Sequence, residues 1–135
     1  MNTEEMRKRT KVFALEVIRL CEELPERPVT RLIRSQLLRA GTSVGSNYRA
    51  SCRAKSGPDF IAKMGIVEEE TDESMFWMEI LMETGIVTSN RIELLYKEAN
   101  ENCAITVASI KTARVKARRA TRNNPQFAFY NPHSS

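Results

Sequence analysis

Apolar and small residues recur at alternating spacings of four and three along most of this chain. The pattern is longest between residues 58 and 84, where the repeating positions are Phe60, Met64, Val67, Thr71, Ser74, Met78 and Leu81. This spacing places side chains on one face of an α-helix, whereas a half-buried strand requires a period of two. No segment shows a convincing strand alternation, so the chain is predicted to be all-α.

Proline and glycine divide the helical pattern into four segments. The sequence PERP at residues 25–28 ends the first helix, Pro58 suits the first position of a new helix, and Gly85 suits a C-terminal cap. Asn2 and Glu5 have the spacing of a capping box at the start of the first helix. The predicted helices cover residues 3–24, 30–54 and 58–84, and then from about residue 88 to about residue 122.

Four amphipathic helices joined by short connections are typical of an antiparallel up-down-up-down four-helix bundle. A length of 135 residues, 41% of them hydrophobic, suits a single domain. We expect the bundle domain to cover residues 1–122. Residues 123–135 contain two prolines and no helical period, and are expected to form a flexible C-terminal tail. A three-helix core, with one helix packed on a neighbouring subunit, is the alternative.

Two features of composition indicate the compartment. The chain has no run of 18 apolar residues and no basic-then-apolar start, so we expect a cytoplasmic protein without a membrane partner. Its three cysteines, Cys21, Cys52 and Cys103, are far apart and lack the CxxC spacing of zinc and redox sites. They are expected to be small buried hydrophobic side chains without chemistry.

Gly41 and Gly45 lie one turn apart inside the second predicted helix. Each glycine costs a helix about 1 kcal/mol relative to alanine, so another interaction must offset this cost. Small residues at this spacing let a second helix approach closely. The approaching helix belongs either to the core of the same chain or to a neighbouring subunit, and the sequence leaves both open.

Residues 37–81, LLRAGTSVGSNYRASCRAKSGPDFIAKMGIVEEETDESMFWMEIL, resemble the central signature of the bacterial four-helix bundle protein family. That family includes proteins encoded within intervening sequences of large-subunit ribosomal RNA genes. The resemblance implies an antiparallel four-helix bundle that assembles as a homopentamer. A related branch serves as the accessory protein of diversity-generating retroelements, where a basic surface engages nucleic acid and a reverse transcriptase.

Catalytic chemistry has little support in the residues, and no enzyme activity or cofactor is expected. Glu70 and Glu73 share a helix face with Trp77, but carboxylate-bridged metal sites in bundles also need histidines, and the single histidine, His133, lies in the tail. No serine or cysteine nucleophile can be paired with a histidine base in the bundle. The two glutamates are an acid pair with unusual pKa values or, as we favour, partners of arginines on the second helix, for which we name Arg34, Arg49 and Arg53.

Charge is strongly segregated along the chain. Residues 1–57 carry a net charge of +6, residues 58–101 carry −8, and residues 102–135 carry +6 with no Asp or Glu. The fourth helix presents a basic ridge, defined here as Lys111, Arg114, Arg118, Arg119 and Arg122. A second basic cluster, Arg7, Lys8 and Lys11, starts the first helix and is expected to lie near the ridge and form one patch with it.

Such a patch is typical of a protein that binds the nucleic-acid backbone. The alternatives are a contact with the acidic third helix of a neighbouring subunit, or a solvated face. Three aromatic residues of the tail, Phe127, Phe129 and Tyr130, are expected to dock on a partner or a neighbouring subunit, or else to stack on unpaired bases. We therefore expect a non-enzymatic oligomer that binds RNA or DNA; the second hypothesis is a protein-interaction scaffold that binds no nucleic acid.

Overall fold

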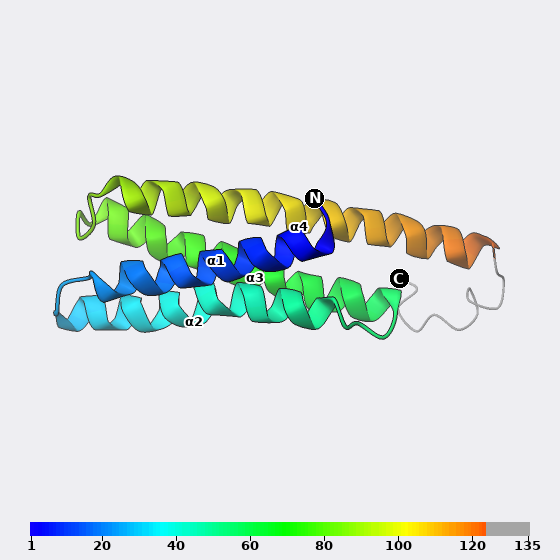
Figure 1. The fold of residues 1–135 in the computed structure, drawn as a ribbon, viewed down its shortest axis with the longest axis horizontal. Coiled ribbons are helices and arrows are strands. Elements are labelled where there is room, and N and C mark those ends of the chain that lie inside the picture. Colours follow the sequence, from blue (N-terminus) through cyan, green and yellow to red (C-terminus); the bar gives the residue numbers. More distant parts are fainter. Residues whose placement is uncertain (124–135) are drawn as a thin grey trace.

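The computed structural model describes residues 1–123, and these form four α-helices with no strand among them. The helices are α1 (Thr3–Glu22), α2 (Pro28–Ser51), α3 (Gly57–Glu83) and α4 (Asn90–Asn123). They alternate in direction and lie side by side (Figure 1). The predicted antiparallel four-helix bundle is therefore confirmed, and every helix is contributed by one chain. The tail residues 124–135, with Phe127, Phe129 and Tyr130, lie outside the described residues.

Local side chains explain where the helices begin. Asn2 accepts a hydrogen bond from the Glu5 amide at 2.8 Å, as the predicted cap requires. Ser56 does the same for the Asp59 amide at 3.2 Å, and a proline occupies the first turn of both α2 and α3. These signals explain where α1, α2 and α3 begin.

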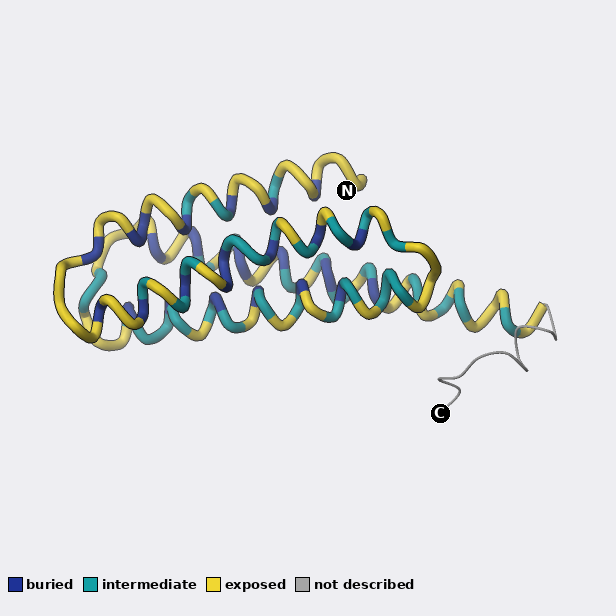
Figure 2. Tube along the Cα trace, turned by 90° about the horizontal axis from the view of Figure 1, so that it is seen from below, coloured by how far each residue is buried: buried dark blue, intermediate teal, exposed yellow. Residues whose placement is uncertain are grey.

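The core contains one apolar stripe from each helix, and Figure 2 shows the buried positions facing the bundle axis. Its largest fully buried side chains include Phe13, Leu20, Leu37, Met64, Met78 and Leu81. In α4 the expectation that Cys103 is buried is wrong, since Asn102 is fully buried whereas Cys103 is only half-buried. Asn102 and Cys103 follow the buried Ala99 by three and four residues, so helical spacing allows either to be buried, and polarity favours Cys103.

The two glycines of α2 face α1 of the same chain. A Cβ on Gly41 would lie 2.8 Å from both γ carbons of Val17, and one on Gly45 would lie 3.2 Å from the Thr10 carbonyl oxygen. Both distances are too short for a relaxed contact. The close approach that offsets the helix cost of these glycines is therefore made within the bundle.

The longest helix, α4, extends beyond its neighbours. It has 34 residues, against 20, 24 and 27 for α1, α2 and α3. Arg9 of α1 pairs with Glu98 and Glu101 of α4, which sets α1 against the first half of α4. The C-terminal turns of α4 consequently project past the start of α1 and α3, as both views show (Figures 1 and 2).

Candidate nucleic-acid interface

The basic ridge lies on the projecting part of α4. All five of its residues, Lys111, Arg114, Arg118, Arg119 and Arg122, are exposed. On the other side of the helix Ile110 is buried and Ala113 and Ala117 are half-buried, so the predicted division of α4 into a core face and a basic face is correct. Lys116 is also exposed in this segment and adds a sixth cation that the sequence analysis did not single out.

The ridge residues form no ion pair with a carboxylate of residues 1–123. The sequence contains no Asp or Glu after Glu101. Within residues 1–123, the ion pairs involve other cations, namely Arg9, Arg19, Arg34, Arg39, Lys63 and Arg91. The ridge charges are thus not neutralised by the described part of their own chain, and they are available to an anionic partner.

The second basic cluster is separated from the ridge, contrary to the expectation of a single patch. Because Arg9 lies opposite Glu98 and Glu101, the helical rise places the ridge about 16–33 Å further along the bundle axis than the cluster. The cluster also divides around α1: Arg7 and Lys11 line a shallow groove against α2 with Arg49, whereas Lys8 faces α4. At physiological salt, charges more than about 8 Å apart are largely screened from each other. The ridge and the second cluster therefore lie at different heights along the bundle and do not form one continuous patch.

Glu70 and Glu73 are bound by an arginine of α2, but not by one of those we named. Arg39 pairs with both carboxylates, at 3.1 Å for Glu70, and the Trp77 indole N–H lies 3.4 Å from a Glu73 oxygen. Arg34 instead donates to the carbonyl oxygens of Cys21 and Leu24, each at 3.1 Å. Glu70 and Glu73 thus join α2 to α3.

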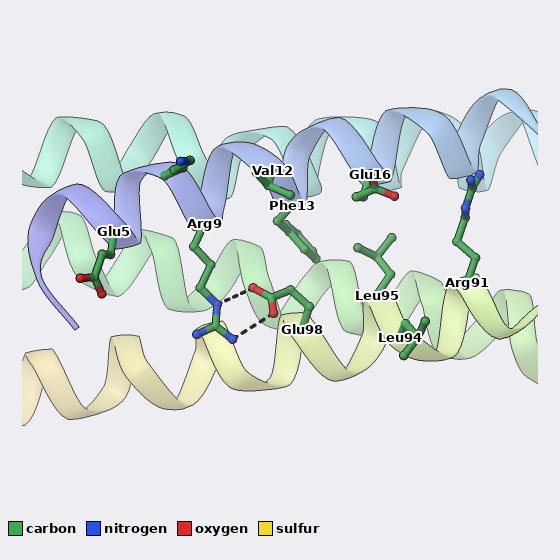
Figure 3. A pocket seen from close by; sticks show the side chains of 10 residues that line it. Glu5, Arg9, Val12, Phe13, Glu16, Arg91, Leu94, Leu95 and Glu98 are labelled. Atoms are coloured by element: carbon green, nitrogen blue, oxygen red, sulfur yellow. Dashed lines mark hydrogen bonds and ion pairs between the residues drawn. The ribbon is translucent and has the colours of Figure 1, made fainter.

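An apolar groove of about 660 Å³ opens between α1 and α4, the adjacent pair that packs least closely. Figure 3 shows Phe13 and Leu95 at its floor, with Val12 and Leu94 beside them. Two of the apolar side chains that line it are exposed, Val12 to 49% and Leu94 to 68%. We call this the α1/α4 groove.

The rim of the α1/α4 groove is charged. Arg9 donates two hydrogen bonds to Glu98, at 2.6 and 2.9 Å (Figure 3), and this contact raises the pKa of Arg9 above its ordinary value. The α1/α4 groove was not among the features predicted from the sequence. Its signal is the adjacent pair Leu94 and Leu95, because two consecutive residues of a helix cannot both face the same core.

The three cysteines are free, and Cys21 is buried as expected, whereas Cys52 and Cys103 are half-buried. Burial raises the pKa of the Cys21 thiol to about 11 and also raises the pKa of Cys103. Within the described residues, no cluster of three His, Cys, Asp or Glu side chains has an arrangement suited to a metal ion. None of the helices in residues 1–123 is long and apolar enough to cross a membrane.

Comparisons with known proteins identify the family of this chain. The chain is similar over 82% of its length to 99% of a protein of unknown function from the S23 ribosomal protein family of Bacteroides thetaiotaomicron, with 29% identity and a TM-score of 0.76. No curated protein matches it. The family described as 23S rRNA-intervening sequence protein matches residues 3–108, which include all of α1, α2 and α3 and stop before the basic ridge. The chain therefore belongs to the 23S rRNA-intervening sequence protein family.

Proposed function

We propose that this protein is a non-enzymatic oligomeric bundle that binds RNA or DNA through the basic ridge of α4. The observation that carries the proposal is the position of the ridge: a helix end that projects from the bundle, exposes six cations and forms no ion pair within residues 1–123. Arginine and lysine in this setting contact phosphates, and each neutralised phosphate releases condensed counterions. The family match ends at residue 108, so this argument rests on the charges of this chain itself.

Recognition by the ridge is directed at the backbone and has little base specificity. Side chains that read base edges are usually a few residues on one element seated in a groove, supported by phosphate contacts around them. The ridge instead has arginine and lysine on most of its exposed positions, with no Asn or Gln among residues 104–122. Arg7, Lys8 and Lys11 form a separate and secondary contact.

The proposed partners are suggested by the family. Its name refers to 23S rRNA intervening sequences, which favours RNA as the nucleic acid and a cytoplasmic location. By resemblance, the bundle assembles as a homopentamer and a reverse transcriptase is a candidate partner protein. A ring of five chains would repeat the ridge five times, and such multivalency strengthens binding without any new contact in the subunit.

The second candidate function is a protein-interaction scaffold, and the α1/α4 groove is the observation that favours it. Exposed Val12 and Leu94 with a charged rim resemble the apolar centre and polar edge of a protein interface. In this case the ridge contacts the acidic α3 of a neighbouring subunit or a partner protein.

Fluorescence anisotropy at low salt, with labelled structured RNA and duplex DNA, separates the two candidates. A ridge variant changes Lys111, Arg114, Arg118 and Arg122 to serine. A matched variant removes the same charge from four other exposed cations, Arg27, Arg31, Arg53 and Lys55. Loss of binding in the ridge variant with retention in the matched variant supports the proposal. Absence of binding by the unchanged protein, or equal loss in both variants, overturns it and leaves the scaffold.

A further inference from the structure

The face of α4 opposite the ridge lines a second groove, which we call the alanine groove. It lies between the projecting turns of α4 and the start of α3, with a volume of about 730 Å³. Its α4 wall includes Ala113, Ala117 and Ala120 together with Lys116, which is not part of the ridge, and its other wall includes Phe60 and Met1. Side chains this small leave room for larger apolar groups from another segment.

The chain that follows α4 carries such groups. The helix α4 ends at Asn123, and Pro125 disfavours its continuation because proline lacks the backbone N–H and restricts the residue before it. Phe127, Phe129 and Tyr130 come next, and no residue from 123 to 135 is Asp, Glu, Lys or Arg. An uncharged segment rich in aromatics is suited to an apolar groove. Because it carries no carboxylate, it has no group that would pair with the basic ridge.

Reach allows these aromatics to enter the alanine groove of their own chain. At about 1.5 Å per helical residue, Ala117 lies about 9 Å and Ser109 about 21 Å back from Asn123. An extended chain covers about 3.4 Å per residue, so Phe127 reaches about 14 Å and Tyr130 about 24 Å from Asn123. The reach of the three aromatics from Asn123 thus matches the distances from Asn123 to the residues that form the α4 wall of the groove.

The same calculation excludes the α1/α4 groove as a site for these aromatics within one chain. Leu94 lies 29 residues before Asn123, which corresponds to about 44 Å of helix. Tyr130 reaches only about 24 Å from Asn123. The α1/α4 groove is therefore not the site we propose for these aromatics.

We propose that residues 125–130 fold back and dock Phe127, Phe129 and Tyr130 in the alanine groove of the same chain. The docked segment covers the small-residue face of the projecting part of α4 and leaves the basic ridge as its exposed face. The docking site of the tail then lies on its own bundle rather than on a partner. This proposal does not depend on nucleic-acid binding.

Alanine methyl resonances in NMR spectra of the full chain test this docking. Aromatic rings shift the resonances of methyl groups beneath them, so the Ala113, Ala117 and Ala120 methyls should move when the chain is ended at Asn123. The same three should move when Phe127, Phe129 and Tyr130 are changed to serine. The Ala40 methyl, buried in the centre of α2, should not move, and a control that changes Gln126 and Asn131 to serine should leave all four unchanged. Unchanged groove methyls in both tail variants overturn the proposal.

A mixing experiment tests whether docking occurs within one chain. Isotope-labelled protein ending at Asn123 is combined with unlabelled full chain and allowed to exchange subunits. If docking is within one chain, the labelled groove methyls keep the positions of the shortened protein. If they return to the positions of the full chain, the tail docks on a neighbouring molecule and the proposal of docking within one chain is overturned.

Discussion

Replacing Gly41 with alanine is the sharpest test of the close packing between α1 and α2. The new Cβ would lie 2.8 Å from both γ carbons of Val17, a side chain with no exposed surface. Alanine favours the helix by about 1 kcal/mol relative to glycine. Overpacking a well-filled core typically costs about 1–3 kcal/mol, so we expect Gly41→Ala to be neutral or to destabilise the protein by up to about 2 kcal/mol.

Gly65 provides a matched control in α3. A Cβ at Gly65 has no neighbouring atom within 4 Å, so Gly65→Ala keeps the helix gain without the clash. We expect Gly65→Ala to stabilise the protein by about 0.5–1 kcal/mol. Urea unfolding followed by circular dichroism measures both changes, since a shift of 1 kcal/mol moves the midpoint by about 0.5 M.

A double variant identifies the atoms responsible. Val17→Ala removes the two γ carbons that the Gly41→Ala methyl would strike, so its cost should be at least about 1 kcal/mol smaller in the Gly41→Ala background than in the unchanged protein. If Gly41→Ala stabilises as much as Gly65→Ala, or the two costs simply add, the close approach of α1 and α2 is not as described.

Three further predictions concern single side chains. Arg39→Met should lower the free energy of unfolding by about 0.5 kcal/mol, because the pair with Glu70 is half-exposed, and a thermal melt unchanged by the substitution would contradict its structural role. Asn102→Leu should raise the urea midpoint, because both polar atoms of this buried amide lack a hydrogen-bond partner within residues 1–123, and a lower midpoint would indicate a partner for them. Burial raises the pKa of Cys21 from 9.0 to about 11. The contribution of the buried neutral thiol to the free energy of unfolding is therefore fully present below pH 9 and is lost as the pH rises through 11. Cys21 should resist iodoacetamide at pH 8 in the folded protein and react after denaturation; rapid native labelling would contradict its burial.

The four helices could be predicted from sequence because each start, stop and apolar face depends on local spacing. Pro28, Pro58 and Gly85 mark boundaries with physical causes that act within a few residues. The basic face of α4 could be predicted for the same reason, since helical periodicity alone places Lys111 and Arg114 opposite the core. Helix boundaries and helix faces can therefore be predicted without knowing which helices pack against one another.

Features that depend on the relative positions of two helices could not be predicted. The partner of Glu70 is Arg39, because that residue lies at the same height as Glu70 when α2 packs on α3, and sequence spacing does not give this height. The separation of Arg7 from the ridge likewise depends on how far α1 overlaps α4. Asn102 was missed for a different reason: its polarity outweighed its position on the buried face.

The salt dependence of nucleic-acid binding tests the central claim most directly. For duplex DNA, the slope of log K against log salt concentration changes by about 0.9 for each phosphate contact. Changing Lys111, Arg114, Arg118 and Arg122 to serine should therefore reduce the magnitude of the slope by about 3.6 if each contacts a phosphate, whereas the matched variant of four other cations should change it little. Equal slopes in the ridge variant and the unchanged protein would contradict the assignment of the ridge as the nucleic-acid interface.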